Sequence, residues 1–151
     1  MGKLGSLINL CEGSEKTESD KEWEYGQGEE KVLNLARTSL ELLYELRRNR
    51  SLKFIVKTGE ELQDKVRTIS QTIDGMSRVV STPRNELSYK NYYSVKNKNL
   101  KRFLKDMEKL ISDCRELSLE TDECPDYYHS KLVDILEASK ISNLASLRIT
   151  M

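Results

Sequence analysis

Between residues 62 and 80 the apolar side chains recur in alternating steps of four and three. This period keeps side chains on one side of an α-helix, and its alternation of β-branched residues with Leu, Ile and Met fits the seam of a two-stranded coiled coil. The same arrangement also packs inside a monomeric helix bundle, so the spacing leaves open whether its partner is the same chain or a second copy. We call this set the central stripe: Leu62, Val66, Ile69, Ile73, Met76 and Val80.

The ends of this helix are predicted from local signals. Thr58 followed by Glu61 has the spacing of a capping box, which would start the helix, and Pro83 would end it. The segment Leu52–Val56 before it fits either an extended connection or more helix. Because only two prolines and seven glycines occur among 151 residues, long uninterrupted elements are expected throughout.

Three further helices follow from apolar residues spaced three or four apart, at about 29–49, 95–120 and 126–147. Hydrophobic residues make up 37% of the chain and charged residues 33%. This mixture is typical of helices that have one apolar stripe and a polar, solvent-exposed opposite face. The sequence therefore predicts an all-α protein, an antiparallel bundle of about four helices formed by residues 31–151.

Residues 1–30 have a different composition. Positions 12–30 hold eight acidic residues, two lysines and three glycines, and such a segment buries too little apolar surface to offset the entropy of ordering it. We therefore expect residues 1–30 to form a flexible acidic N-terminal segment that precedes the helical domain.

Few residues of this chain are of the types that catalysis or metal binding requires. His129 is the only histidine, and Cys124 lies five residues before it, which invites a thiolate–imidazole pair. No third residue is evidently placed to orient the ring, and Cys114, Cys124 and His129 lack the paired spacing of a zinc site. We therefore expect no enzyme, no metal site and no cofactor.

The first residues, MGKLGS, fit the M-G-x-x-x-[ST] motif for N-myristoylation of Gly2, with an unmodified start as the alternative. A single myristoyl chain binds a bilayer only marginally, with an association constant on the order of 10^4 M⁻¹, so a second membrane signal is expected. Palmitoylation of Cys11 is one candidate. No apolar run approaches the roughly 18 residues that cross a bilayer.

The other candidate is the segment 89–105, which carries six basic residues, no acidic one and four aromatic residues. Cations bind anionic headgroups and aromatic rings prefer the interfacial zone. The same residue types also stack single-stranded bases, and a third interpretation is that half of the cations simply line the wet face of a helix. The predicted patch consists of Lys90, Tyr92, Tyr93, Lys96, Lys98, Lys101, Arg102 and Lys105.

Together these features predict a non-enzymatic helical interaction protein, cytoplasmic and membrane-associated on the cytosolic face. It would self-associate or bind another helical protein, as an adaptor or in the manner of viral matrix and accessory proteins, to which the likeness is one of design alone. A soluble oligomerisation module is the second interpretation. A nucleic-acid binder ranks third, because 25 basic residues balance 25 acidic ones and leave no net positive field.

Overall fold

The structure is a computed structural model that describes the backbone of residues 18–79 and 83–146, and the side chains of 26–76 and 92–146. The elements in these ranges are helices, which confirms the predicted all-α bundle. They are α2 (Glu18–Arg48), α3 (Leu52–Val79), α4 (Pro83–Arg115), α5 (Asp126–Ala138) and the one-turn α6 (Ile141–Ala145).

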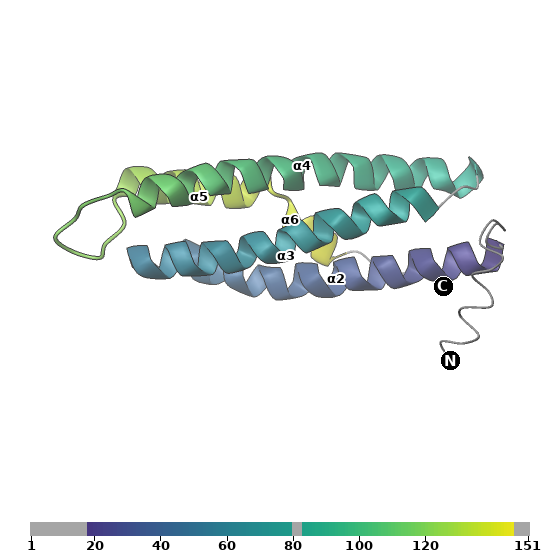
Figure 1. The fold of residues 1–151 in the computed structure, drawn as a ribbon, viewed down its shortest axis with the longest axis horizontal. Helices are drawn as coiled ribbons and strands as arrows, with labels where there is room; N and C mark the ends of the chain where they lie inside the picture. The colour runs from purple at the N-terminus through teal and green to yellow at the C-terminus, as the bar shows by residue number, and fades with distance from the viewer. Residues whose placement is uncertain (1–17, 80–82, 147–151) are drawn as a thin grey trace, which may run out of the picture.

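The helices α2, α3 and α4 run back and forth along the long axis of the molecule (Figure 1). α5 returns along α4 for only part of this length, and α6 then packs against α2. The bundle therefore has two parts. In the four-helix part, residues 36–66 and 103–138, α5 completes the bundle. In the three-helix part, residues 18–35, 67–79 and 83–102, the helices α2, α3 and α4 continue beyond the end of α5, and α6 packs against the near end of this part.

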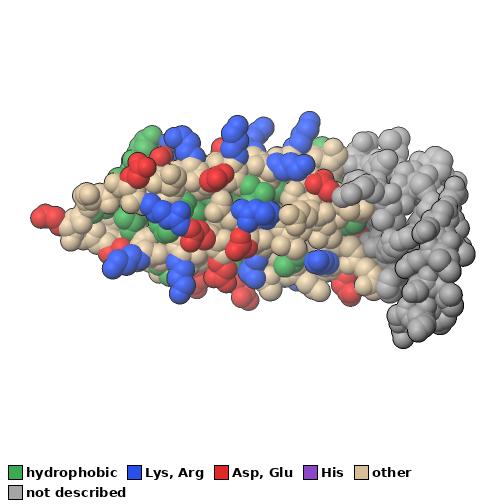
Figure 2. Space-filling view, viewed as in Figure 1, with side chains coloured by type: hydrophobic (Ala, Val, Ile, Leu, Met, Phe, Trp, Pro, Cys, Tyr) green, Lys and Arg blue, Asp and Glu red, His purple; other side chains and the backbone are tan. Residues whose placement is uncertain are grey.

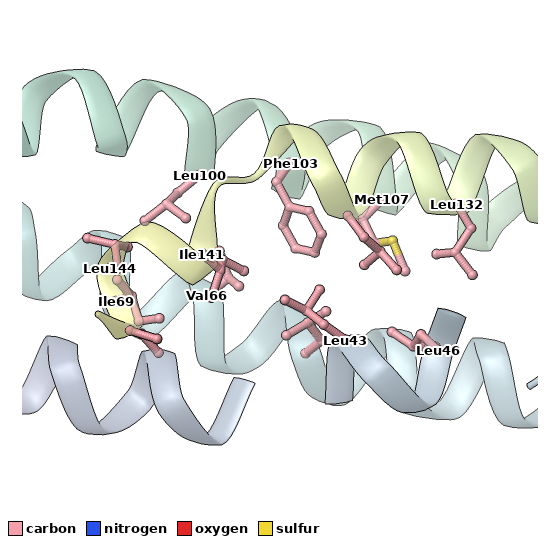
Figure 3. Packing of buried hydrophobic residues seen from close by; sticks show 14 of the residues in the cluster. Leu43, Leu46, Val66, Ile69, Leu100, Phe103, Met107, Leu132, Ile141 and Leu144 are labelled. Carbon is pink, nitrogen blue, oxygen red and sulfur yellow. The ribbon is translucent and has the colours of Figure 1, made fainter. Parts of the chain in front are cut away.

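The central stripe lies inside the single chain. Leu62, Val66, Ile69 and Ile73 have at most 1% of their surface exposed, and Met76 has 5%; Val80 lies outside the described residues. Figure 3 shows Val66 and Ile69 pointing toward Ile141 and Leu144 of α6. Of the two interpretations of this stripe, the structure therefore shows the intramolecular one, because side chains buried this deeply offer no surface to a second copy.

The predicted start of α3 is wrong. α3 begins at Leu52, where the Phe54 amide donates a hydrogen bond to the Ser51 hydroxyl over 3.2 Å, as at an N-cap. Thr58 is therefore inside the helix and buried, and it cannot form the predicted capping box with Glu61. The segment Leu52–Val56 is helical, the second of the two alternatives for it.

α2 and α4 both begin earlier than predicted. α2 starts at Glu18, so residues 18–30 are helical and not the flexible linker that we expected. α3 ends at Val79, before Pro83 as predicted, and Pro83 itself begins α4, where its missing amide hydrogen costs nothing. Tertiary contacts that local composition does not encode accompany the extra turns, such as the one between the Tyr93 hydroxyl and Glu29.

The last predicted helix, 126–147, is two helices. The backbone of Lys140 takes a left-handed conformation, with φ 57° and ψ 30°, which ends α5 and starts α6 in a new direction. This turn brings Ile141 and Leu144 into the core, where they are at most 1% exposed. α6 thus fills the bundle at the point where α5 ends.

Candidate functional site: the cationic face of α4

The whole of the predicted cationic segment lies within α4, so helix geometry decides where each side chain points. At about 100° per residue, Lys98, Lys101, Arg102 and Lys105 fall within an arc of about 100° on the side opposite the core. All four side chains are exposed, and exposed Lys109 continues the row one turn further on. We call Lys98, Lys101, Arg102 and Lys105 the cationic face. Lys and Arg side chains project from the edge of the molecule along which α4 runs (Figures 1 and 2).

The charges of this face are largely uncompensated by neighbours. Lys101 Nζ lies 3.7 Å from the Asp74 carboxylate. Within the parts of the chain that the structure describes, no ion pair joins Lys98, Arg102 or Lys105 to an acidic residue. Three of the four cations are therefore free to bind an external anion.

Lys101 is connected to a buried polar network between α3 and α4. The other Asp74 oxygen accepts a hydrogen bond of 2.8 Å from the side-chain nitrogen of Asn97. The side-chain oxygen of Asn97 in turn accepts one of 2.6 Å from the Ser70 hydroxyl. Because Asn97 and Ser70 are buried, their bonds fix the rotation of α4 relative to α3. This rotation turns the cationic face toward solvent.

The aromatic residues of the segment whose side chains the structure describes, Tyr92, Tyr93 and Phe103, do not belong to that face. Phe103 and Tyr93 are each 2% exposed, and the Tyr93 hydroxyl donates a 3.1 Å hydrogen bond to Glu29. Tyr92 packs edge-on against Tyr93, with ring centroids 5.1 Å apart. The prediction that Tyr93 forms part of the ligand patch is therefore wrong: its place next to lysines in the sequence reflects the helical period.

Tyr92 and Lys96 form a separate pair at the side of α4 near α6. The Lys96 ammonium lies 5.3 Å from the centre of the half-buried Tyr92 ring, a cation–π contact. The Tyr92 hydroxyl donates a 3.5 Å hydrogen bond to the carbonyl of Asn143 within α6. These two predicted patch residues thus pack within the fold, apart from the cationic face. The Lys90 side chain, Gly2 and Cys11 lie outside the described residues.

His129, the candidate base, is buried in the first turn of α5, at the end of the bundle where α5 begins. Arg50 Nη1 lies 3.2 Å from His129 Nδ1, and because a guanidinium only donates, Nδ1 is the acceptor and Nε2 carries the proton. His129 Nε2 is buried and makes no hydrogen bond of full geometry within the described residues, although the backbone of Leu46 favours the protonated ring. Burial, and then the Arg50 charge, lower the pKa of His129 below 6.5.

The Cys124 thiol contacts the Pro125 carbonyl, 3.6 Å away, and the Cys114 thiol. Among the described residues, no hydrogen bond joins Cys124 to His129. Within the described residues, no group of three or more Cys, His, Asp or Glu side chains is arranged to hold a metal ion. None of the described helices is long and apolar enough to cross a membrane.

No protein-family model, curated protein or solved structure matches this chain.

Proposed function

We propose that this chain is a non-enzymatic helical interaction protein that binds anionic membrane surfaces through the cationic face of α4. The observation that carries the proposal is the row of exposed cations at Lys98, Arg102 and Lys105, which no described acidic residue pairs. N-myristoylation of Gly2 is the second membrane signal in this proposal.

The magnitudes favour two signals acting together. Each lysine or arginine near an anionic leaflet contributes about 1 kcal/mol, so the three unpaired cations contribute about 3 kcal/mol, an association constant on the order of 10^2 M⁻¹. A myristoyl chain alone gives on the order of 10^4 M⁻¹. Each signal is weak by itself, and their sum gives stable and reversible attachment.

A membrane suits this face better than a single-stranded nucleic acid. Single-strand binders stack bases on exposed aromatic rings, whereas Tyr93 and Phe103 are in the core and Tyr92 is half-buried under Lys96. A straight row of cations on one helix matches a flat array of headgroups. Self-association stays a prediction, and it would need a surface other than the buried central stripe.

Vesicle sedimentation tests the proposal with the full, unacylated chain. We expect binding to vesicles that contain phosphatidylserine and none to phosphatidylcholine alone, with affinity falling as salt rises. The variant Lys98→Glu/Arg102→Glu/Lys105→Glu should lose at least two orders of magnitude in affinity.

The matched control is Lys31→Glu/Arg37→Glu/Lys57→Glu, which makes the same change of net charge at exposed positions on α2 and α3. It should retain most of the binding. Equal loss in both variants would mean that only net charge matters, and would contradict a dedicated face on α4. Binding of single-stranded RNA that the first variant abolishes, without vesicle binding, would favour the nucleic-acid alternative.

A further inference from the structure

Two cysteines ten positions apart meet at the end of the bundle where α4 connects to α5. Cys114 is in the last turn of α4, and Cys124 directly precedes Pro125 at the start of α5. Both are free thiols, each is 2% exposed, and both belong to the same buried cluster. Their side chains interact directly with each other.

The backbone holds each cysteine in place without help from the sulfurs. The Cys124 amide donates a 2.7 Å hydrogen bond to the Arg50 carbonyl, and Ser51 and Glu123 form an isolated antiparallel bridge beside it. The Leu52 amide bonds to the Asp122 carbonyl over 2.6 Å. The loop is thus fastened to the start of α3 while Cys114 is fixed by α4, so the two thiols are positioned in advance of any reaction.

Cys114 can be approached from outside. It lines an open cavity of about 590 Å³ between the start of α3 and the loop, together with apolar Leu52, Val56, Leu117 and Leu119. The 43% exposed Leu119 lies at its border. The cavity is large enough to admit part of a small organic reagent next to Cys114, whose own side chain is 2% exposed.

We propose that Cys114 and Cys124 are a modification site at which a small-molecule disulfide oxidises the chain to an internal Cys114–Cys124 disulfide. The Cys114 thiolate attacks one sulfur of the reagent, whose S–S bond breaks and releases one reagent thiolate. The Cys124 thiolate then attacks the Cys114 sulfur, forming the internal bond and releasing the second reagent thiolate. The two protein thiols lose two electrons, the reagent disulfide gains them, and the two protons end on the released thiols.

The environment makes this reaction slow at neutral pH and faster in base. Burial, with a further contribution from Cys124, raises the pKa of Cys114 to about 11. Burial also raises the pKa of Cys124, and the nearby Arg50 charge opposes part of that rise. Because the thiolate is the nucleophile, the rate should rise about tenfold per pH unit between pH 7 and 9. The pair therefore stays reduced until the reagent is abundant.

The test uses the full chain carrying Cys11→Ser, so that only the two buried thiols remain, with oxidised glutathione as the reagent. We expect the product to be a monomer two hydrogens lighter than the reduced chain, with no glutathione attached and no free thiol after unfolding. Its thermal midpoint should rise by about 5–10 °C, because the disulfide closes a loop of about ten residues. Reductant should reverse both changes.

The matched controls are Cys11→Ser/Cys114→Ser and Cys11→Ser/Cys124→Ser, which cannot close the disulfide and should end as glutathione adducts or unreacted. Should either control unfold, the Cys11→Ser chain still decides the question because it keeps both buried residues. A glutathione adduct accumulating on that chain, a covalent dimer, two unreacted thiols or an unchanged thermal midpoint would each overturn the proposal.

Discussion

Both parts of the bundle have an apolar core, but they differ in the buried side-chain hydrogen bonds that join one helix to another. In the four-helix part, large apolar side chains from four helices meet one another (Figure 3), among them Leu46, Val66, Phe103, Met107 and Leu132. In the three-helix part, polar side chains bond to one another across helices, as Tyr93 does to Glu29 and Asn97 to Ser70. Apolar side chains such as Val32, Ile73 and Leu100 are buried there as well, so these polar pairs add to an apolar core.

Different parts of the molecule therefore contribute most to stability and to the alignment of the helices with one another. Apolar contacts contribute most of the free energy of folding but tolerate sliding between helices. A buried hydrogen bond contributes only about 1 kcal/mol net, yet its geometry is satisfied in one register. We therefore expect the four-helix part to dominate stability and the three-helix part to set the rotation of α4 and with it the cationic face.

The largest effect should come from emptying the apolar core. Phe103→Ala removes a ring that is 2% exposed and should lower the free energy of unfolding by about 3–5 kcal/mol, measured by urea titration. Val95→Ala on the same helix is the control, because Val95 is 57% exposed and its loss should change little. Similar effects of both substitutions would mean that Phe103 is not packed as described.

Breaking the polar network should cost less. Asn97→Ala leaves the Ser70 hydroxyl and one Asp74 oxygen without their partner, which should lower the free energy of unfolding by about 1–3 kcal/mol. Asn99→Ala, two positions along the same helix, is the control and should change it by less than about 0.5 kcal/mol. If Asn97→Ala raised stability, the network would be a cost retained for alignment, and vesicle binding of that variant would then be the informative measurement.

Two glycines near the end of the three-helix part should respond in opposite directions. A Cβ on Gly28 would lie 2.5 Å from Met76 Cγ, and the overlap should cost about 1–3 kcal/mol, more than the gain in helix propensity. A Cβ on Gly75 meets nothing within 4 Å, so Gly75→Ala should stabilise the fold by about 1 kcal/mol. Thermal unfolding of both variants checks the contrast, and equal shifts would contradict the close approach of α2 and α3 at Gly28.

The smallest effect is an opposite pH response at the two ends. Because the pKa of His129 is lowered from 6.5 by burial and by Arg50, the unfolded chain binds its proton first, and stability falls as pH drops below 6.5. Burial raises the pKa of Glu29 above 4.5 despite the Tyr93 hydrogen bond, so the folded chain takes up that proton first and stability is regained as pH falls toward 4.5.

Urea titrations between pH 7.5 and 4.5 separate the two groups. His129→Gln should flatten the loss that begins near pH 6.5. Glu29→Gln keeps an acceptor for the Tyr93 hydroxyl but removes the buried charge, so it should raise stability at pH 7 and abolish the recovery in acid. A pH profile that neither substitution alters would show that other groups control it.

The apolar pattern predicted the helices better than their ends. The alternation of four and three marked the buried side of α3 correctly, since it is a property of one helix turning on its own axis. The start of α3 at Leu52 was missed because it depends on Asp122, which is distant in sequence. Asp122 accepts hydrogen bonds from the amides of Leu52 and Lys53 and so holds its loop against the start of the helix. Residues 18–30 were assigned to a linker on their composition, whereas their helix lies along α3.

The candidate site was predicted in part for the same reason. The cations between Lys98 and Lys105 were found from their density, but Tyr93 was counted with them because α4 was taken to begin twelve residues later than it does. Extending the helical phase back from Leu100 to Tyr93 would have placed that ring in the core. The meeting of Cys114 and Cys124 had no signal beyond their number, because the course of the loop decides it.

The periodicity and type of the side chains were sufficient to predict that this chain is helical and which side of each main helix is buried, because both act over one or two helical turns. Contacts between distant residues determine that the central stripe is satisfied within one chain, that α5 stops and α6 turns into the core, and that the face with the four cations stays open to solvent. Those outcomes depend on which helices become neighbours. That choice arises from packing and hydrogen bonding between residues far apart in the chain, which no local pattern records.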